Sequence, residues 1–239
     1  KRAICAGPGN PPVVVDETAH VDKAARDILL GASTDNNIIC VDEKEVLVVS
    51  SVADRLLEAM TGHGAVVLDA ARVRQLEGLI FTAPPGPRGR GAMNHDLVGR
   101  DVAVILSRIG MHVPSSTRLA IAEVDSSHPL LWSEQMMPIL PVCRVPTADQ
   151  AIDLAIEIEG GHRHTAVMHS THLDRLSRMA RECNCSIFVK NGRSQAGLGL
   201  DGEGYCSFTI ASPTGEGLTG PRQFSRWRRC VLVDHFRIT

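Results

Sequence analysis

The feature that most constrains the fold is the alternation of short apolar runs with segments of helical periodicity. The runs rich in valine, isoleucine and alanine cover residues 13–16, 45–49, 65–69, 118–124, 139–145, 165–169 and 186–190. Apolar residues recur every three or four positions in residues 21–31, 52–60, 70–80, 102–109, 148–158 and 173–181. Continuously apolar strands are typical of sheets that are covered on both faces. The pattern therefore predicts an α/β fold with a mainly parallel, doubly wound sheet.

The fold class also predicts where a site would lie. Ligands of open parallel sheets bind in the crevice beyond the carboxyl ends of the strands, so we expect a site there. No G-x-G-x-x-G follows a strand, and no phosphate-binding G-x-x-x-x-G-K-[ST] loop occurs. The last third of the chain is glycine-rich and ends in "RWRRCVLVDHF" (226–236), which predicts a basic strand.

Charge and composition exclude several classes of partner. The net charge is −2 and aromatic residues make up 3%, which argues against binding of nucleic acid or an anionic membrane surface. The apolar runs are too short to span a bilayer. Seven irregularly spaced cysteines, without a signal segment, indicate free thiols in a reducing cytoplasm. Because the chain starts at Lys1 and enters mid-domain sequence within a few residues, we expect a part of a longer protein.

One cysteine differs from the others by its position. Cys40 follows the polar run Ser33-Thr34-Asp35-Asn36-Asn37, a turn able to expose it, and precedes an apolar strand. We therefore consider a reactive thiol at Cys40 beside a purely structural one. Four other cysteines adjoin strand-like stretches and are expected to be small buried side chains, namely Cys5, Cys143, Cys206 and Cys230.

Two closely spaced pairs raise the question of a metal. Cys183 and Cys185 form a C-x-C, and His162 and His164 form an H-x-H. Neither spacing matches the usual zinc-ligand patterns, so we expect no metal site.

Several blocks of the chain resemble one family. "AGPGNPPVVVDETA", "GASTDNNIICVDEKEV", "HPLLWSEQMMPILPVCRV", "EGGHRHTAVMHS", "SIFVKNG" and "TIASPTGEG" occur in the order found in CoA-acylating aldehyde dehydrogenases. The nearest resemblance is to the propionaldehyde and acetaldehyde dehydrogenases of propanediol- and ethanolamine-utilisation microcompartments. It covers nearly all 239 residues and implies the catalytic half of such an enzyme, with the fold of the aldehyde dehydrogenase catalytic domain.

The resemblance implies a role for Cys40. It aligns with the family's nucleophile, whose thiolate attacks the aldehyde to give a thiohemiacetal. Hydride transfer to NAD then leaves a thioester, and the backbone N–H of Cys40 helps to hold the oxyanion. Ala6 stands where hydrolytic aldehyde dehydrogenases carry a water-activating glutamate. CoA is therefore the expected acyl acceptor, and a short aliphatic aldehyde the expected substrate, propionaldehyde before acetaldehyde.

Two further residues gain roles from the same resemblance. Glu134, in "EQMMPILPV", resembles a glutamate that contacts the nicotinamide ribose, although Met136-Met137 replace the family's Phe-Gly. His164 matches a histidine that relatives carry near the cleft, where it could assist thiolate formation or deprotonate CoA, or be satisfied within the fold. Asp35 and Glu43 are expected to be solvated loop carboxylates, and His162 to face solvent.

The resemblance also implies an organisation. Residues 1–20 would end an NAD-binding domain and begin the catalytic one, 21–200 would form the catalytic domain, and 201–239 would return to the nucleotide domain and supply an oligomerisation strand. We expect a homo-oligomer, cytoplasmic or enclosed in a microcompartment with its shell proteins as neighbours. A hydrolytic dehydrogenase giving a free acid, or a non-catalytic oligomerisation or shell-packing module, are the alternatives.

Overall fold

The computed structural model describes residues 1–83 and 85–234, and its centre is one parallel sheet. The sheet has seven strands in the order β3-β4-β5-β2-β1-β6-β7, and all neighbouring pairs are parallel. The strands are β1 (Pro12–Val15), β2 (Glu45–Val49), β3 (Ala65–Leu68), β4 (Leu119–Glu123), β5 (Ile139–Val145), β6 (Thr165–His169) and β7 (Ile187–Lys190). The predicted α/β class with a parallel sheet is confirmed.

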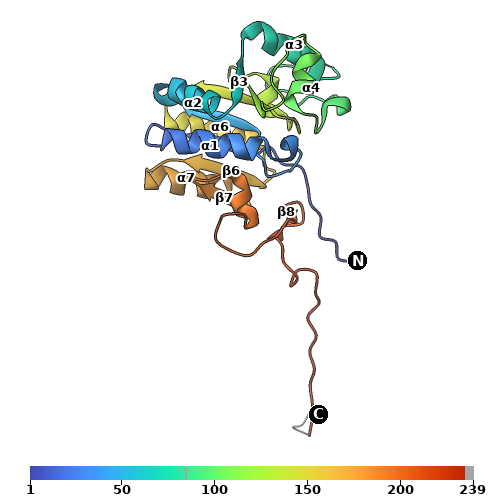
Figure 1. Cartoon of the computed structure of the whole chain (residues 1–239). Helices are drawn as coiled ribbons and strands as arrows, with labels where there is room; N and C mark the ends of the chain where they lie inside the picture. Colours follow the sequence, from blue (N-terminus) through green and yellow to red (C-terminus); the bar gives the residue numbers. More distant parts are fainter. Residues whose placement is uncertain (84, 235–239) are drawn as a thin grey trace.

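Helices cover both faces of this sheet, as the continuously apolar strands predict (Figure 1). The longer helices are α1 (Val21–Ala32), α2 (Ser50–Gly62), α3 (Ala70–Ile80), α6 (Ala148–Glu159) and α7 (Leu173–Cys183), and the shorter ones are α4 (Val102–Ser107) and α5 (Pro129–Trp132). On one face, α1 and α2 pack against alternate residues of β1 and β2, such as Val13 and Val46. On the other, α6 and α7 pack against Val14 and Leu47.

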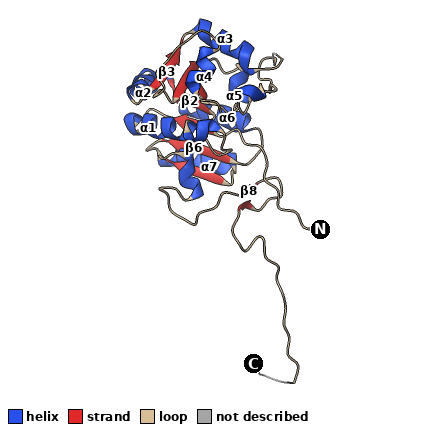
Figure 2. Cartoon of the chain, turned by 45° about the vertical axis from the view of Figure 1, so that its right-hand side comes forward, coloured by secondary structure: helices blue, strands red, loops and turns tan. Residues whose placement is uncertain are grey.

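A third apolar cluster covers the β3–β4 side of the sheet, where α3 and α4 pack against Ala120 and Ala122 of β4 (Figure 2). The residues after α3 are tied to this part by an antiparallel bridge between Phe81 and Met93 and by the bond from the Arg88 N–H to Ser127 O, 2.8 Å. Among the described residues, no helix combines the length and the apolar character that a bilayer crossing requires.

The C-terminal region departs from the prediction of a strand at residues 226–236. Beyond the sheet, the described chain forms a 3₁₀ helix, η3 (Ser194–Leu198), and two short strands, β8 (Ile210–Ala211) and β9 (Gly217–Leu218), which pair antiparallel. Residues 226–234 contain no strand, because no strand of the described residues lies beside them to complete the hydrogen bonds, and His235 and Phe236 lie outside the described residues. This segment runs away from the body of the molecule in both views, with Trp227 90% exposed (Figures 1 and 2).

Candidate active site

The candidate site residues lie at the amino-terminal edge of the sheet. Cys40 stands in the loop before β2, Glu134 in the loop before β5, and His164 directly before β6. Because the strands are parallel, the segments that lead into them gather at one edge. The expectation of a site beyond the carboxyl ends is therefore wrong for these three residues. The physical reason is that each of them precedes its strand in the chain.

Gly9 brings the three residues together. It lies shortly before β1, and β1 is the strand between β2 and β6 in the sheet. A methyl group at Gly9 would lie 2.9 Å from His164 Cγ and 3.0 Å from the carbonyl oxygen of Cys40. The backbone N–H of Gly9 also stabilises the carboxylate of Glu134. The absence of a side chain at Gly9 thus allows the backbone to touch Cys40 and His164 at once.

The nucleophile candidate is half-buried and is not activated by burial. Desolvation raises the pKa of the Cys40 thiol above its ordinary value, and the negative charge of Glu134 raises it further. The ammonium group of Lys44 acts in the opposite direction and lowers this pKa. Thiolate formation at Cys40 therefore depends on the charges around it.

His164 is buried and neutral at physiological pH. Its Nδ1 shares a hydrogen bond of 2.9 Å with Thr165 Oγ1, and its backbone N–H donates to Glu159 Oε1 at 2.9 Å. Burial lowers the pKa of its imidazole to about 4, helped by the nearby His162 and Lys44. Nε2 is buried without a hydrogen-bond partner among the described residues. In the tautomer whose Nδ1–H donates to Thr165 Oγ1, Nε2 is unprotonated and can accept a proton from a reacting group.

Glu134 lines a cavity of about 370 Å³ beside Gly9. Burial raises the pKa of its carboxyl, and Lys44 opposes this effect. The walls of the cavity combine the backbone of residues 8–10 with the aromatic ring of Trp132 and the side chains of Arg90 and His162. A half-buried carboxylate with free lone pairs at such a wall suits a hydroxyl-bearing ligand.

The segment from Cys40 into β2 carries charged residues whose burial the sequence analysis does not predict. Glu43 was expected to be solvated, yet Asp42, Glu43, Lys44 and Glu45 are all fully buried. Glu43 accepts bonds from the Ser194 N–H (2.8 Å) and Ser194 Oγ (2.9 Å). The carboxyl packs where a methyl group at position 31 of α1 would overlap it. The sequence signal that could have indicated this burial is that the charged residues run directly into a buried strand.

The remaining expectations have mixed outcomes. Asp35 is exposed as expected, whereas His162 is half-buried and shares a hydrogen bond of 3.0 Å with Arg90 Nη1. Cys143 is buried, but Cys5, Cys206 and Cys230 are exposed, because the stretches around them form no strand of the sheet. In residues 1–83 and 85–234, no group of three or more His, Cys, Asp or Glu side chains is arranged to hold a metal ion.

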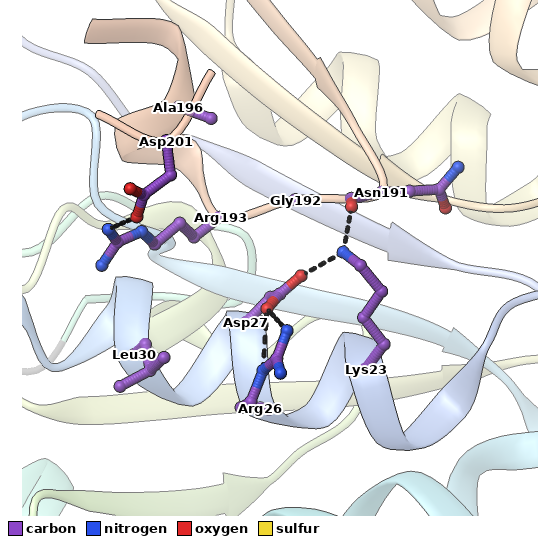
Figure 3. Close-up of a pocket in the computed structure, with 9 residues that line it drawn as sticks. All are labelled: Lys23, Arg26, Asp27, Leu30, Asn191, Gly192, Arg193, Ala196 and Asp201. Carbon is purple, nitrogen blue, oxygen red and sulfur yellow. Dashed lines mark hydrogen bonds and ion pairs between the residues drawn. The ribbon is translucent and has the colours of Figure 1, made fainter. Parts of the chain in front are cut away.

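A separate hollow of about 460 Å³ lies on the α1 face, beside the segment after β7 (Figure 3). Its cations are paired: Lys23 Nζ lies 2.5 Å and Arg26 Nη2 3.1 Å from the Asp27 carboxylate, and Arg193 pairs with Asp201. None of the candidate catalytic residues lines it. The candidate catalytic residues therefore lie at the amino edge of the sheet and not in this hollow.

The buried Glu43 predicts a pH dependence of stability. Burial raises the pKa of its carboxyl to about 8, so the folded chain keeps a proton that the unfolded chain has released. The stabilising contribution is complete at acidic pH and is lost as the pH rises through about 8. Near pH 6.5 we expect the free energy of unfolding to fall by about 1.4 kcal/mol per pH unit from this group, and the slope to decrease to about half of that at pH 8.

Urea denaturation at pH 6.5, 7.0, 7.5 and 8.0 measures this slope. Burial also raises the pKa of Asp42 to about 7, so part of the slope remains without Glu43. Glu43→Gln should reduce the slope, whereas Glu58→Gln on the exposed side of α2 should not. Equal slopes in the wild type and Glu43→Gln would mean that Glu43 is ionised in the folded state.

The chain shares its fold with solved propionaldehyde dehydrogenases. Over 97% of its length it superimposes, with a TM-score of 0.91 and 50% identity, on 52% of a propionaldehyde dehydrogenase of Rhodopseudomonas palustris solved with bound CoA and an acylated cysteine. A propionaldehyde dehydrogenase from the fucose utilisation microcompartment of Clostridium phytofermentans gives a TM-score of 0.90 at 43% identity, covering 99% of this chain and 53% of that one. No family model matches the chain.

Sequence comparison finds CoA-acylating aldehyde dehydrogenases among the relatives of the chain. It is 53% identical over its full length to 51% of the acetaldehyde dehydrogenase (acetylating) EutE of Salmonella typhimurium. It is 48% identical, again over its full length, to 50% of the propanal dehydrogenase (CoA-propanoylating) of the same organism. Over its full length the chain is therefore similar to CoA-acylating aldehyde dehydrogenases, as the sequence motifs indicate. It spans about half the length of these curated relatives.

Proposed function

We propose that this chain carries the catalytic residues of an NAD-dependent, CoA-acylating aldehyde dehydrogenase. The observation that carries the proposal is the convergence of Cys40 and His164 on Gly9, with Glu134 beside them. Relatives named for acetaldehyde and propanal, and a solved relative with CoA bound and a cysteine acylated, support this chemistry. Short aliphatic aldehydes are the proposed substrates, with propionaldehyde first and acetaldehyde second.

The chain's own residues account for the covalent steps. The Cys40 thiolate forms a bond to the aldehyde carbon, and the backbone N–H of Cys40 donates to the oxyanion of the resulting thiohemiacetal. The nicotinamide cofactor, when bound, accepts the hydride that this intermediate must lose to become a thioester. His164 Nε2 accepts the proton of the incoming CoA thiol. The thiol sulfur then forms a new thioester bond as the bond to Cys40 Sγ breaks.

The cavity beside Glu134 fits part of such a cofactor. Glu134 and Gly9 both line this space of about 370 Å³, so a ribose hydroxyl could donate to the Glu134 carboxylate. Cys40 and His164 do not line the cavity but approach Gly9, which does. The structure of an engineered glycolyl-CoA reductase, 50% identical to this chain, holds NADP⁺. The choice between NAD and NADP is therefore part of the proposal, and we favour NAD on the family resemblance.

The hydrolytic alternative needs a base that activates water. Ala6, at the position where hydrolytic relatives carry a glutamate, has no ionisable group. Glu43 is turned into the core, where both of its carboxylate oxygens accept from Ser194. Neither residue can deprotonate a water molecule at Cys40, which favours CoA as the acceptor. The non-catalytic alternative is opposed by the assembled set of Cys40, His164 and Glu134.

The organisation of the whole protein is also a proposal. We propose that residues 1–20 lead from a nucleotide-binding domain into the catalytic domain, with β1 already inside the sheet. Residues 21–200 complete the catalytic domain, and 201–239 form the return and oligomerisation segment. Exposed Phe224, Trp227 and Val233 support a homo-oligomer that covers them. A microcompartment relative supports a cytoplasmic protein, free or enclosed with shell proteins.

NADH formation from propionaldehyde by the complete protein, with and without CoA, tests this function. We expect sustained turnover only with CoA, because neither Ala6 nor Glu43 can activate water at Cys40 and the CoA thiol is a better nucleophile than water. The expected product is propionyl-CoA, identified by mass spectrometry. Sustained turnover to propionate without CoA would establish the hydrolytic alternative instead, and absence of NADH under both conditions would favour the non-catalytic one.

A further inference from the structure

Lys44 is a buried cation whose donors are all used on neutral oxygens. Its side chain is fully buried, and Nζ donates to Asn37 O (2.6 Å), Asn37 Oδ1 (2.8 Å) and Ile39 O (3.2 Å). An ammonium group has three protons, so its hydrogen-bonding capacity is complete. Since none of these three partners is a carboxylate, the positive charge is not cancelled by contact and can act on neighbouring groups.

The oxygens that Lys44 binds belong to an unusual turn. Asp35, Asn36 and Asn37 have φ values of 45°, 53° and 64°, a left-handed run that L-residues rarely adopt in succession. Such a conformation persists only where the surroundings determine it. Asn36 Nδ2 donates to Gly99 O at 3.0 Å, and Asn37 Nδ2 donates to Ala32 O (2.8 Å) and to the backbone oxygen of Glu43 (2.9 Å).

The amide of Asn37 and the ammonium of Lys44 thus join the two ends of the loop that carries Cys40. Asn37 ties the end of α1 to the segment before β2, and Lys44 returns from that segment to the turn. Cys40 lies between Ile39, whose carbonyl accepts from Lys44, and the buried residues that follow. The position of the thiol is therefore set by contacts made three and four residues away from it in the chain.

The charges facing this loop come from three elements. Glu134 (before β5), Asp42 and Glu45 face Lys44 together with Cys40. Glu134, Lys44 and Asp42 face the Cys40 thiol, and among these only Lys44 favours the thiolate. Burial lowers the pKa of Lys44, while the facing anions raise it. Burial raises the pKa of Glu134, Asp42 and Glu45, which weakens the negative charge opposing the thiolate.

We propose that Lys44 is the positioning residue of the nucleophile, whose buried ammonium holds the left-handed turn and keeps a positive charge beside Cys40. This inference rests on the proposed function in that Cys40 is taken as the nucleophile. It adds a residue that acts through Cys40 and touches neither substrate nor cofactor. Its consequence is that Cys40 forms a thiolate at neutral pH more readily than its burial alone would permit.

The pH dependence of Cys40 alkylation tests the inference without any aldehyde or cofactor. Iodoacetamide labelling of the full chain, with the Cys40 peptide quantified by mass spectrometry, gives the rate for this thiol alone. Lys44→Met keeps the length of the side chain and removes the charge, and we expect the rate at pH 7 to fall about tenfold. Lys23→Met, which removes a surface ammonium paired with Asp27, should leave the rate unchanged. Glu134→Gln should raise the rate, because Glu134 opposes the thiolate.

An unchanged alkylation profile in a folded Lys44→Met variant would overturn the proposal. A second measurement uses the wild-type chain and so tests the proposal even if the Lys44→Met variant does not fold. The chain contains four lysines, at positions 1, 23, 44 and 190, so ¹⁵N-lysine labelling resolves each Nζ by NMR. We expect Lys44 to be an ammonium group at pH 7, and a neutral amine would overturn the inference. Retained turnover in Cys40→Ala would instead overturn the proposed function, so the two failures are distinguishable.

Discussion

Replacing Cys40 by alanine is expected to reduce CoA-dependent NADH formation by about 10⁴-fold or more, because the variant has no atom that can form the thioester. The change removes one sulfur from a half-buried loop that Asn37 and Lys44 hold in place through other atoms. We therefore expect the variant to fold, with an unchanged circular dichroism spectrum. The measurement is the initial rate of NADH formation by the complete protein with propionaldehyde and CoA.

The matched control for this prediction is Cys206→Ala, which removes an exposed thiol from the glycine-rich region beyond the sheet. It should retain the wild-type rate. In the wild type, acid quenching after mixing with propionaldehyde and NAD without CoA should trap a propionyl group on the Cys40 peptide. Comparable turnover by Cys40→Ala, or an acyl group on another cysteine, would show that Cys40 is not the nucleophile.

Replacing His164 by glutamine is expected to lower kcat by about 10²- to 10³-fold, the usual effect of removing a general base. The glutamine fills most of the space of the ring, but its amide cannot act as a base. Because the pKa of His164 is about 4, its imidazole is neutral from pH 5 upward. The activity that depends on it should therefore decline only as the pH approaches 4, where the ring becomes protonated.

His169→Gln is the matched control for His164. His169 ends β6 at the opposite edge of the sheet, is equally buried, and burial lowers its pKa to about 4 as well. The two substitutions therefore carry similar folding costs but differ in their distance from Cys40 along the strand. A loss of kcat confined to His164→Gln supports its role as a base. Equal losses in both variants would indicate a purely structural role for His164.

Much of the fold could be predicted from local patterns. Six of the seven strands fall within the predicted runs, and β1 begins one residue earlier, at Pro12. Continuous apolar segments such as Val46–Val49 have no other stable environment than a covered sheet. The strand predicted at 226–236 does not form over the described residues 226–234, because tertiary contacts and not the local pattern decide the outcome there. Its local pattern is adequate, but a strand needs a hydrogen-bonded neighbour, and this chain does not place one beside residues 226–234.

The candidate residues could be selected from the sequence, but their surroundings could not. Cys40 was singled out by its place after a polar turn, and His164 and Glu134 by family motifs. Glu43 is predicted from the sequence to be a solvated loop carboxylate, and nothing in the sequence indicates that Lys44 is buried beside it. Their burial depends on Ser194 and Asn37, of which the first lies 151 residues away in the chain. Patterns of hydrophobicity do not report hydrogen bonds between such distant residues.

The sequence alone determined the class of the fold, the identity of the nucleophile candidate and the family resemblance, since these depend on periodicity and on contiguous motifs. Tertiary structure decided that the candidate residues lie at the amino edge, where parallel strands bring the preceding loops of β1, β2, β5 and β6 together. It also decided that charged residues 42–45 are internal. The physical reason is that burial and charge coupling depend on three-dimensional neighbours: a buried ammonium is stable only where oxygens such as those of Asn37 surround it.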